Sequence, residues 1–213
     1  MRDRLLGNID YVTALAKLRN CEINYDPSEV RPPDWNFDVH RSLVGRERPG
    51  PPEPGGVWET ARELVRDYEF TPPELVRVVY HRHDPLLGRT LLLEGHFAAL
   101  RFYMGGGKVT YEVIKRLDSG QVGFLASCQS QRSPTLGLIL RLGWLLFGRR
   151  AQLRFYRRCG QRLHDLVQAS LIGVPTPAAT RPPLEINDLV LVPSGAEPHP
   201  LDRLTIRQHN PAR

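Results

Sequence analysis

The stretch KVTYEVIKRLDSGQVGFLASCQ, residues 108–129, predicts an antiparallel hairpin at the centre of the fold. Apolar and polar residues alternate over 109–113, as they do in a strand with one buried face. Asp118-Ser119-Gly120 is a turn sequence, so the segments on its two sides should pair in antiparallel fashion. The alternation places Tyr111 on the core side and Glu112 in solvent.

Helices and further strands flank this hairpin. A helical pattern covers 57–70 and should end at Thr71-Pro72-Pro73, because a residue before proline is pushed out of the helical region. A longer amphipathic helix is predicted over 149–170, and a short one over 5–18. The segments that we expect to form strands are 75–80, 90–94, 97–103, 108–116 and 121–129. Helix, strands and helix in this order predict an α+β fold.

Proline marks the expected boundaries of the folded part. Of the 19 prolines, seven lie over 27–54 and eight lie from residue 175 onward. We therefore expect an N-terminal helix and proline-rich arm over 1–54, a folded domain over 55–174, and a proline-rich, disordered tail over 175–213. A short strand at 189–192 is the one element that the tail could form.

Composition narrows the class of protein. A chain of 213 residues with 41% hydrophobic and 24% charged residues is that of a globular protein. Three widely spaced cysteines do not suggest a disulfide framework or a zinc site. The sequence has neither an apolar leader nor a stretch of about 18 apolar residues that could span a membrane. These features predict a cytoplasmic protein, without a metal or cofactor.

The net charge of +6 is concentrated late in the chain. No acidic residue occurs over 119–164, and on the predicted helix four arginines repeat every fourth residue, flanked by a fifth. The candidate anion-binding residues are Arg150, Arg154, Arg157, Arg158 and Arg162. Such a face attracts phosphate groups, anionic lipids or acidic partners, although a merely solvated helix face has the same composition.

Several blocks of the sequence resemble, in the same order, an uncharacterised bacterial family of unknown function related to the START-like (SRPBCC) helix-grip superfamily. The blocks are WETARELV with YEF (58–65 and 68–70), DPLLGRTLLLEG (84–95), YEVIKRLDSGQV (111–122) and LLFGRRAQ (145–152). The resemblance covers about residues 34–167. It implies a curved antiparallel sheet wrapped around a long C-terminal helix, with an apolar cavity between them.

The sequence departs from the family at Gly105-Gly106-Gly107, where the family has a longer segment with further strands. The resemblance therefore implies a shortened sheet, which leaves the presence of a cavity open. The residues expected to line a cavity are Leu100, Phe102, Tyr111, Phe124, Leu142, Leu145, Leu146, Leu153 and Tyr156.

Three functions follow from these observations. The first is binding of an apolar small molecule or lipid between the sheet and the C-terminal helix. The second is peripheral attachment to an anionic membrane or partner through the arginine face. The third is an enzyme on the same scaffold, but no acid/base pair or catalytic residue stands out, so this is the least favoured. An open strand edge near 108–116 would suit a homodimer, and nucleic acid is not an expected partner.

Three other motifs have simpler explanations. His81 and His83 could bind a metal on a strand, but no third ligand has a suitable spacing, which favours a polar loop. Gly105-Gly106-Gly107 followed by Lys108 lacks the remaining positions of a phosphate-binding loop. Cys159 follows two arginines, yet the helical stripe places it beside the apolar face, which favours a buried thiol.

Overall fold

The computed structural model describes residues 10–20, 35–86, 88–97, 100–104, 108–131, 149–176, 184–186 and 188–194. The chain divides into two compact units that are interleaved along the sequence. Unit 1 comprises Met1–Asn24, Arg66–Gly106 and Pro175–Arg213, and unit 2 comprises Tyr25–Val65 and Gly107–Val174. This division differs from the three consecutive parts expected from the prolines, 1–54, 55–174 and 175–213.

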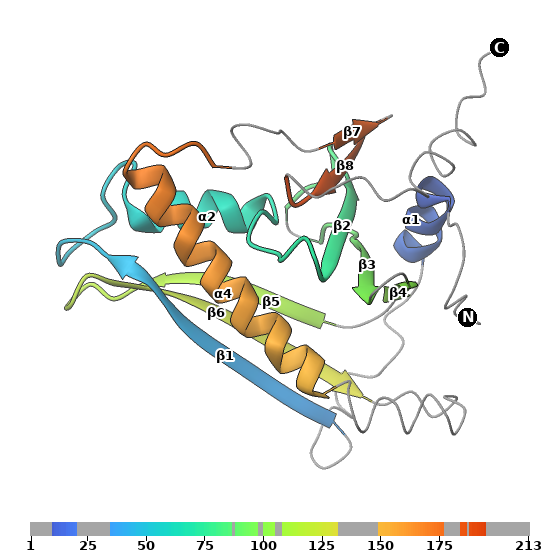
Figure 1. Cartoon of the computed structure of the whole chain (residues 1–213), viewed down its shortest axis with the longest axis horizontal. Helices are drawn as coiled ribbons and strands as arrows, with labels where there is room; N and C mark the ends of the chain where they lie inside the picture. Colours follow the sequence, from blue (N-terminus) through green and yellow to red (C-terminus); the bar gives the residue numbers. More distant parts are fainter. Residues whose placement is uncertain are drawn as a thin grey trace. The chain divides into compact units, whose positions relative to one another are not determined.

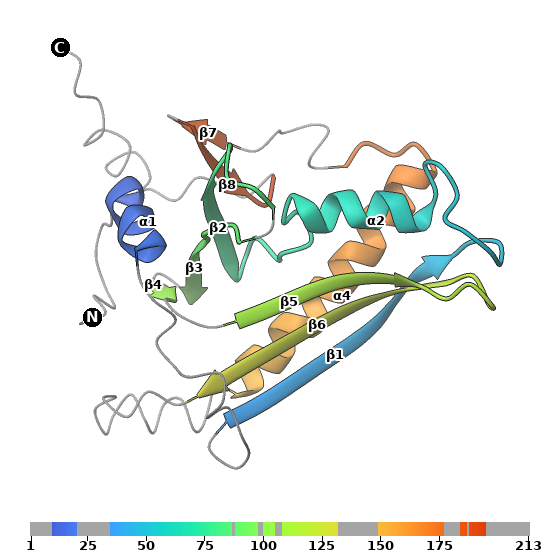
Figure 2. The same ribbon diagram turned by 180° about the vertical axis from the view of Figure 1, so that it is seen from behind.

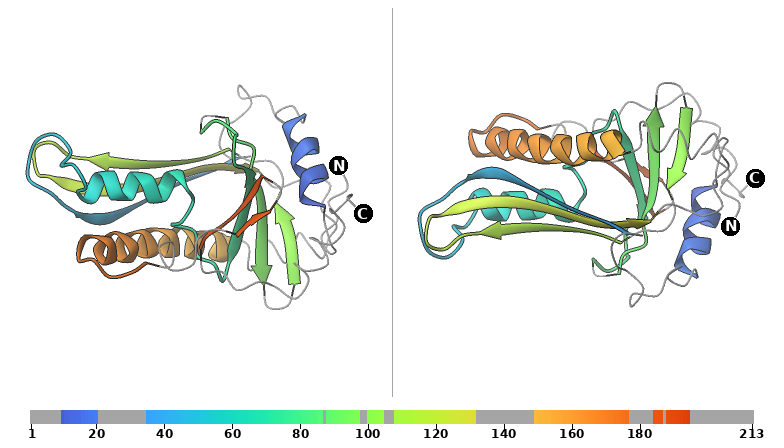
Figure 3. Two further views of the ribbon diagram at one scale, coloured as in Figure 1. Left: turned by 90° about the horizontal axis from the view of Figure 1, so that it is seen from above. Right: turned by 90° about the horizontal axis from the view of Figure 1, so that it is seen from below.

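Unit 2 is a three-stranded antiparallel sheet in the order β1-β6-β5 with a long helix on one face. The strands are β1 (Trp35–Arg46), β5 (Lys108–Lys115) and β6 (Gln121–Gln131), and the helix is α4 (Arg149–Leu171). Figure 1 shows α4 crossing the sheet, and Figure 3 shows the helix and the sheet as separate layers. The predicted long helix and hairpin are confirmed, since β5 and β6 pair antiparallel.

The turn of this hairpin needs a glycine for two reasons. Gly120 has a φ of 70°, a left-handed conformation that side chains with a Cβ disfavour. A Cβ at this position would also collide with the backbone carbonyl of Glu47. The close approach is part of the fold, because Glu47 N–H donates a hydrogen bond of 2.9 Å to Gly120 O. The turn is thereby held against the end of β1.

β1 corrects the sequence analysis. Residues 35–46 were expected to belong to an arm outside the folded domain, yet they form a 12-residue strand that pairs along β6. The sequence pattern does not reveal this strand, because polar residues face the core and apolar ones face solvent. Asp38 and Ser42 lie on the face toward α4, whereas Leu43 is exposed.

Unit 1 contains a second antiparallel sheet, in the order β4-β3-β2-β8-β7. Its strands are β2 (Val76–His81), β3 (Leu92–Phe97), β4 (Leu100–Met104), β7 (Leu184–Ile186) and β8 (Leu189–Val192). The predicted strand at 189–192 is confirmed, and it pairs with β2 in the middle of the sheet. The α+β class is thus correct, but the strands form two sheets rather than the single one expected.

Helix α1 (Tyr11–Arg19) packs on this second sheet. Asp10 caps its first turn, with Oδ1 accepting hydrogen bonds from Val12 N–H and Thr13 N–H. The buried side chains of Tyr11 and Leu15 join the core cluster that β2, β3 and β8 supply. The predicted N-terminal helix is therefore present over residues 11–19 and belongs to a core.

Helix α2 (Val57–Arg66) is shorter than the predicted 57–70. Tyr68 has a φ of 58°, so the helix ends before the Thr71-Pro72-Pro73 stop signal is reached. The turn that follows buries Phe70 completely. It also buries Glu69, whose carboxylate accepts bonds of 2.9 Å from Ser194 N–H and 2.6 Å from Ser194 Oγ. These contacts explain the early end of α2.

Candidate functional site

The face of the three-stranded sheet that α4 covers carries an unusual set of side chains. β6 contributes small and apolar residues to it, among them the buried Phe124 and Ala126. β1 contributes Asp38, His40 and Ser42, which lie beside these β6 residues in the ladder. Asp38 is only 5% exposed. Polar groups thus enter an interface that is otherwise apolar.

The contact between α4 and β1 is closest at Gly160. A Cβ at this position would lie 2.8 Å from Ser42 Cβ and closer still to Ser42 Oγ. Ser42 Oγ is itself buried and has no hydrogen-bond partner among the residues that the structure describes. Further along, His164 Nδ1 lies 2.7 Å from Val44 O. Small residues and a side-chain bond to the backbone therefore hold the helix against the strand.

Two buried side chains and a half-buried one form a polar cluster where the first half of α4 crosses β6. We call Cys128, Gln152 and Tyr156 the Cys–Gln–Tyr cluster. Gln152 Nε2 lies 3.2 Å from Tyr156 Oη and 3.8 Å from Cys128 Sγ. Burial and a hydrogen bond with Cys128 raise the pKa of Tyr156, so its phenol stays protonated at neutral pH. The cluster offers a neutral hydroxyl, a thiol and an amide.

His40 adds a neutral imidazole to the same face of the sheet. Burial lowers its pKa, and the positive charge of Arg157 lowers it further. His40 is therefore uncharged at pH 7, and a neutral imidazole has one donor and one acceptor nitrogen. Nothing in the sequence pattern singled it out, because strand β1 itself was not predicted.

Aromatic side chains lie next to the Cys–Gln–Tyr cluster. Tyr111 of β5 stacks on Phe124 of β6, with the ring centroids 6.0 Å apart and the planes at 10°. Tyr111 and Leu153 are half-buried, whereas Phe124 and Tyr156 are buried. These four residues are the predicted cavity residues that unit 2 brings together. Glu112 is exposed, as the alternation predicted.

The remaining predicted cavity residues fall outside the described part of unit 2. Leu100 and Phe102 belong to β4 in unit 1, so their assignment to the same sheet as Tyr111 is wrong. The sequence gives no direct sign of this, because both β4 and β5 have the composition of ordinary strands. Leu142, Leu145 and Leu146 lie outside the described residues.

The arginine face of α4 is exposed for most of its length. Arg150, Arg154, Arg157 and Arg158 are exposed, and Arg162 is half-buried. Asp165 is the one acidic residue between Arg149 and Leu171. The face therefore presents several guanidinium groups with little acidic charge on the same helix.

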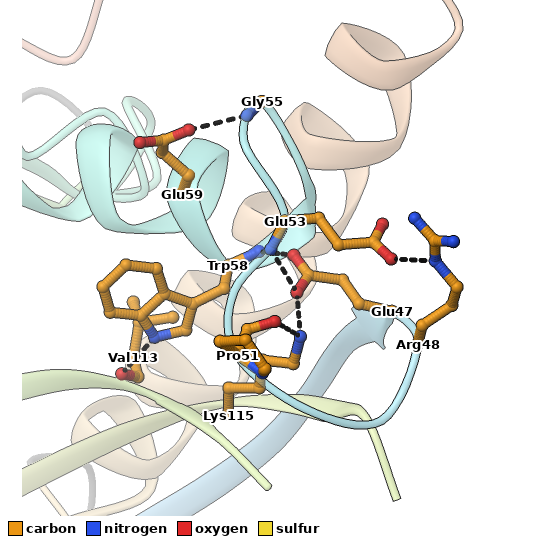
Figure 4. A network of polar contacts seen from close by, with 9 residues as sticks. All are labelled: Glu47, Arg48, Pro51, Glu53, Gly55, Trp58, Glu59, Val113 and Lys115. Atoms are coloured by element: carbon orange, nitrogen blue, oxygen red, sulfur yellow. Dashed lines mark hydrogen bonds and ion pairs between the residues drawn. The ribbon is translucent and has the colours of Figure 1, made fainter. Parts of the chain in front are cut away.

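A second polar site in unit 2 is structural. The Glu47 carboxylate accepts hydrogen bonds from Lys115 Nζ, Trp58 N–H and Glu53 N–H, as Figure 4 shows. Lys115 Nζ also donates to Pro51 O at 2.7 Å. These bonds fix the proline-rich loop 47–56 against β5 and the start of α2. Trp58 Nε1 donates a hydrogen bond to Val113 O. One carbonyl of β5, the strand that the sequence analysis expected to offer an open edge, is therefore already hydrogen-bonded.

Unit 1 contains a buried pair around Glu94. Tyr11 Oη donates a hydrogen bond of 2.8 Å to Glu94 Oε2, and Arg77 Nη2 lies 3.8 Å from Glu94 Oε1. Glu94 is fully buried. Because β2, β3 and α1 each supply one partner, this group joins three elements of unit 1.

The other motifs lie partly within the part of the chain that the structure describes. Within the described part of the chain no group of three His, Cys, Asp or Glu residues could hold a metal. His83 lies in an exposed turn, 3.9 Å from Asp188. Cys159 is a buried thiol, as predicted, whereas Gly105-Gly106-Gly107 lies outside the described residues.

Among the described helices, none has the length and apolar character that crossing a membrane requires. Comparison of the chain with protein-family models, with curated proteins and with solved structures finds no match.

Proposed function

We propose that unit 2 is a helix-grip domain that binds an apolar small molecule or lipid between α4 and the three-stranded sheet. The observation that carries this proposal is the Cys–Gln–Tyr cluster, which places polar groups inside an otherwise apolar interface. Ligand sites in proteins commonly combine apolar walls with a few converging polar groups. The half-buried Tyr111 and Leu153 would form part of the apolar wall.

The protonation states suit a ligand with an uncharged polar end. Tyr156 keeps its proton and His40 is neutral at pH 7, because burial disfavours the charged form of each. A phenol donates a hydrogen bond and a neutral imidazole accepts one. A hydroxyl or a carbonyl on an apolar ligand would satisfy these groups.

Native mass spectrometry tests this function. We expect the gently purified protein to carry an extra mass that organic extraction removes, and to bind added 1-hexadecanol, an apolar chain with an uncharged hydroxyl, after extraction. Leu153→Trp should abolish 1-hexadecanol binding by filling the site. Leu43→Trp places the same side chain on the opposite, exposed face of the sheet and should leave binding unchanged. A bare protein that takes up no 1-hexadecanol, or equal effects of both variants, would contradict the proposal.

A second function is favoured by the arginine face of α4, through which the protein would attach to an anionic membrane. Each basic residue near an anionic surface contributes on the order of 1 kcal/mol. The triple variant Arg150→Gln, Arg154→Gln and Arg158→Gln should therefore bind phosphatidylserine-containing vesicles on the order of 100-fold more weakly. Vesicles of phosphatidylcholine alone serve as the control. Unchanged binding by the folded triple variant would exclude this function.

A further inference from the structure

The face of the three-stranded sheet away from α4 is apolar and exposed. Figure 2 shows this face, with β5, β6 and β1 side by side and α4 behind them. Phe37, Val39 and Leu43 of β1 are 45%, 55% and 59% exposed, and Ile114 of β5 is 45% exposed. We call the side chains of β1, β6 and β5 that point this way the outer face. Single exposed apolar residues are ordinary, but four on one small sheet face indicate an interaction surface.

The middle of the outer face also carries one positive and one negative side chain, placed symmetrically about β6, and a further exposed arginine, Arg46, lies opposite Gln121 at one end. Arg41 of β1 and Glu112 of β5 both lie opposite Leu125 of β6 in the two ladders. Directly opposed residues in antiparallel strands point to the same side of the sheet. Arg41, Leu125 and Glu112 thus form one row across the outer face, and both charged side chains are exposed.

The neighbouring row has the same symmetry with apolar residues. Leu43 of β1 and Ile114 of β5 both lie opposite Gly123 of β6. Because Gly123 has no side chain, the surface of this row is recessed over β6, and the side chains of Leu43 and Ile114 project on either side. Leucine and isoleucine have similar volumes, and either can pack against the other.

We propose that the outer face binds the outer face of a second copy of this chain, in a two-fold dimer whose axis runs along the strands. Such an axis keeps β6 over β6 and brings β1 of each copy over β5 of its partner. Arg41 then faces Glu112 of the partner subunit twice, once on each side of the axis. Leu43 packs on the partner subunit's Ile114 in the same way, and the two Leu125 side chains meet at the axis. These two rows are self-complementary in both charge and shape, as a two-fold interface requires.

The size of the face predicts a weak dimer. Three strands about 4.8 Å apart and seven residues rising about 3.4 Å each span an area on the order of 300 Å². A stable interface buries roughly 800 Å² on each partner. We therefore expect a weak dimer that dissociates on dilution, with sheets packed face to face as in a β-sandwich. This inference does not depend on ligand binding between α4 and the inner face.

Sedimentation velocity of the full chain over a concentration series tests the dimer. The wild type should shift from monomer toward dimer as its concentration rises. In a dimer of Arg41→Glu, position 41 of each copy faces Glu112 of the partner subunit, so two pairs of acidic groups meet. In a dimer of Glu112→Arg, position 112 of each copy faces Arg41 of the partner subunit, so two pairs of basic groups meet. Each variant should associate more weakly by on the order of tenfold or more. Circular dichroism checks that both variants keep the fold.

The decisive sample is an equimolar mixture of the two variants. In the mixed dimer Glu at position 41 of one chain faces Arg at position 112 of the other, and the natural Glu112 and Arg41 face each other on the second side. The mixture should therefore associate as well as the wild type, although neither variant does so alone. Arg154→Glu on α4 and Glu63→Arg on α2 give the same changes in net charge at exposed positions and should leave association unchanged.

Three results would overturn the proposal. One is a wild type that stays monomeric at the highest concentration that remains soluble. Another is a dimer that neither variant weakens, which would place the interface elsewhere, for example at a strand edge. Failure of the mixture to restore association would likewise rule out the two-fold arrangement.

Discussion

Lys115 Nζ lies 2.5 Å from Glu47 Oε2, and the two side chains are only 2% and 1% exposed. The pair joins the end of β1 to β5 and holds the proline-rich loop between β1 and α2. A buried ion pair of this kind adds little net stability, but the loss of one partner leaves a charge in a poorly solvated place. Substitution of either residue alone should therefore destabilise the folded protein.

We predict that Glu47→Gln destabilises unit 2 by about 3 kcal/mol or more, because Lys115 remains buried without a carboxylate. Chemical denaturation followed by circular dichroism measures the loss. Glu53→Gln removes an exposed ion pair with Arg48 and should cost much less stability than Glu47→Gln. Equal losses for the two variants would contradict the special role of the buried pair.

The same carboxyl group gives stability a pH dependence. Burial acts to raise the pKa of Glu47, but the hydrogen bonds from Lys115, Trp58 and Glu53 outweigh it and hold the pKa below its usual 4.5. The folded state thus binds this proton less readily than the unfolded state. Its contribution is complete above pH 4.5 and is lost as the pH falls through the lowered folded value. Urea unfolding midpoints of the wild type should fall more steeply on the acid side than those of Glu47→Gln.

The packing of α4 on β1 predicts that Gly160→Ala destabilises the protein by about 1–3 kcal/mol. In an exposed helix the same change would stabilise by about 1 kcal/mol. The difference arises because a new Cβ would collide with Ser42. Ser42→Gly removes the colliding atoms, so the double variant should recover part of the loss in a double-mutant cycle. Simple additivity of the two changes would contradict this account.

His40 should titrate below its usual pKa of 6.5, because burial and then Arg157 disfavour its charged form. Arg157→Gln should raise this pKa toward 6.5 without reaching it, since the burial remains. Imidazole signals in an NMR titration give the value directly. Arg150→Gln, about 10 Å further along the helix, should leave it unchanged. A larger effect of Arg150→Gln would show that the helix sits differently on the sheet.

Helix α1 should depend on Leu15, whose side chain is fully buried in the cluster with β2, β3 and β8. Leu15→Ala removes this contact at a cost of about 2–5 kcal/mol. Trypsin should then cut more rapidly after Lys17 and Arg19, which lie in the released helix. Ala16→Ser, at an exposed position of the same helix, is the matched control. Unchanged cleavage of Leu15→Ala would mean that α1 does not depend on this contact.

The sequence predicts the elements whose signals are local. The β5–β6 hairpin follows from alternation and from a turn that ends in Gly120, and the buried stripe of α4 follows from helical spacing. The sequence analysis did not find β1, because its core-facing side carries the polar residues Asp38, His40 and Ser42. The apolar residues of its alternating pattern face solvent instead.

The pairing of strands could not be predicted in the same way. Val78 of β2 lies opposite Val192 of β8, which is near the other end of the chain. No local pattern identifies such a partner, and an apolar strand fits either sheet equally well. The site shares this limitation, because Tyr111 and Tyr156 were found from periodicity whereas His40 needed the correct strand order.

The interleaving of the two units has a consequence for synthesis on the ribosome. Every segment of unit 2 has been translated once Val174 is made, so this unit can fold while the chain is still growing. Unit 1 must wait for β8, although β2 was translated much earlier and its five residues Val76–Tyr80 are all buried in the finished protein. During that interval β2 can pair with β3 but lacks its second partner, β8, and a chaperone that shields residues 76–80 would act then.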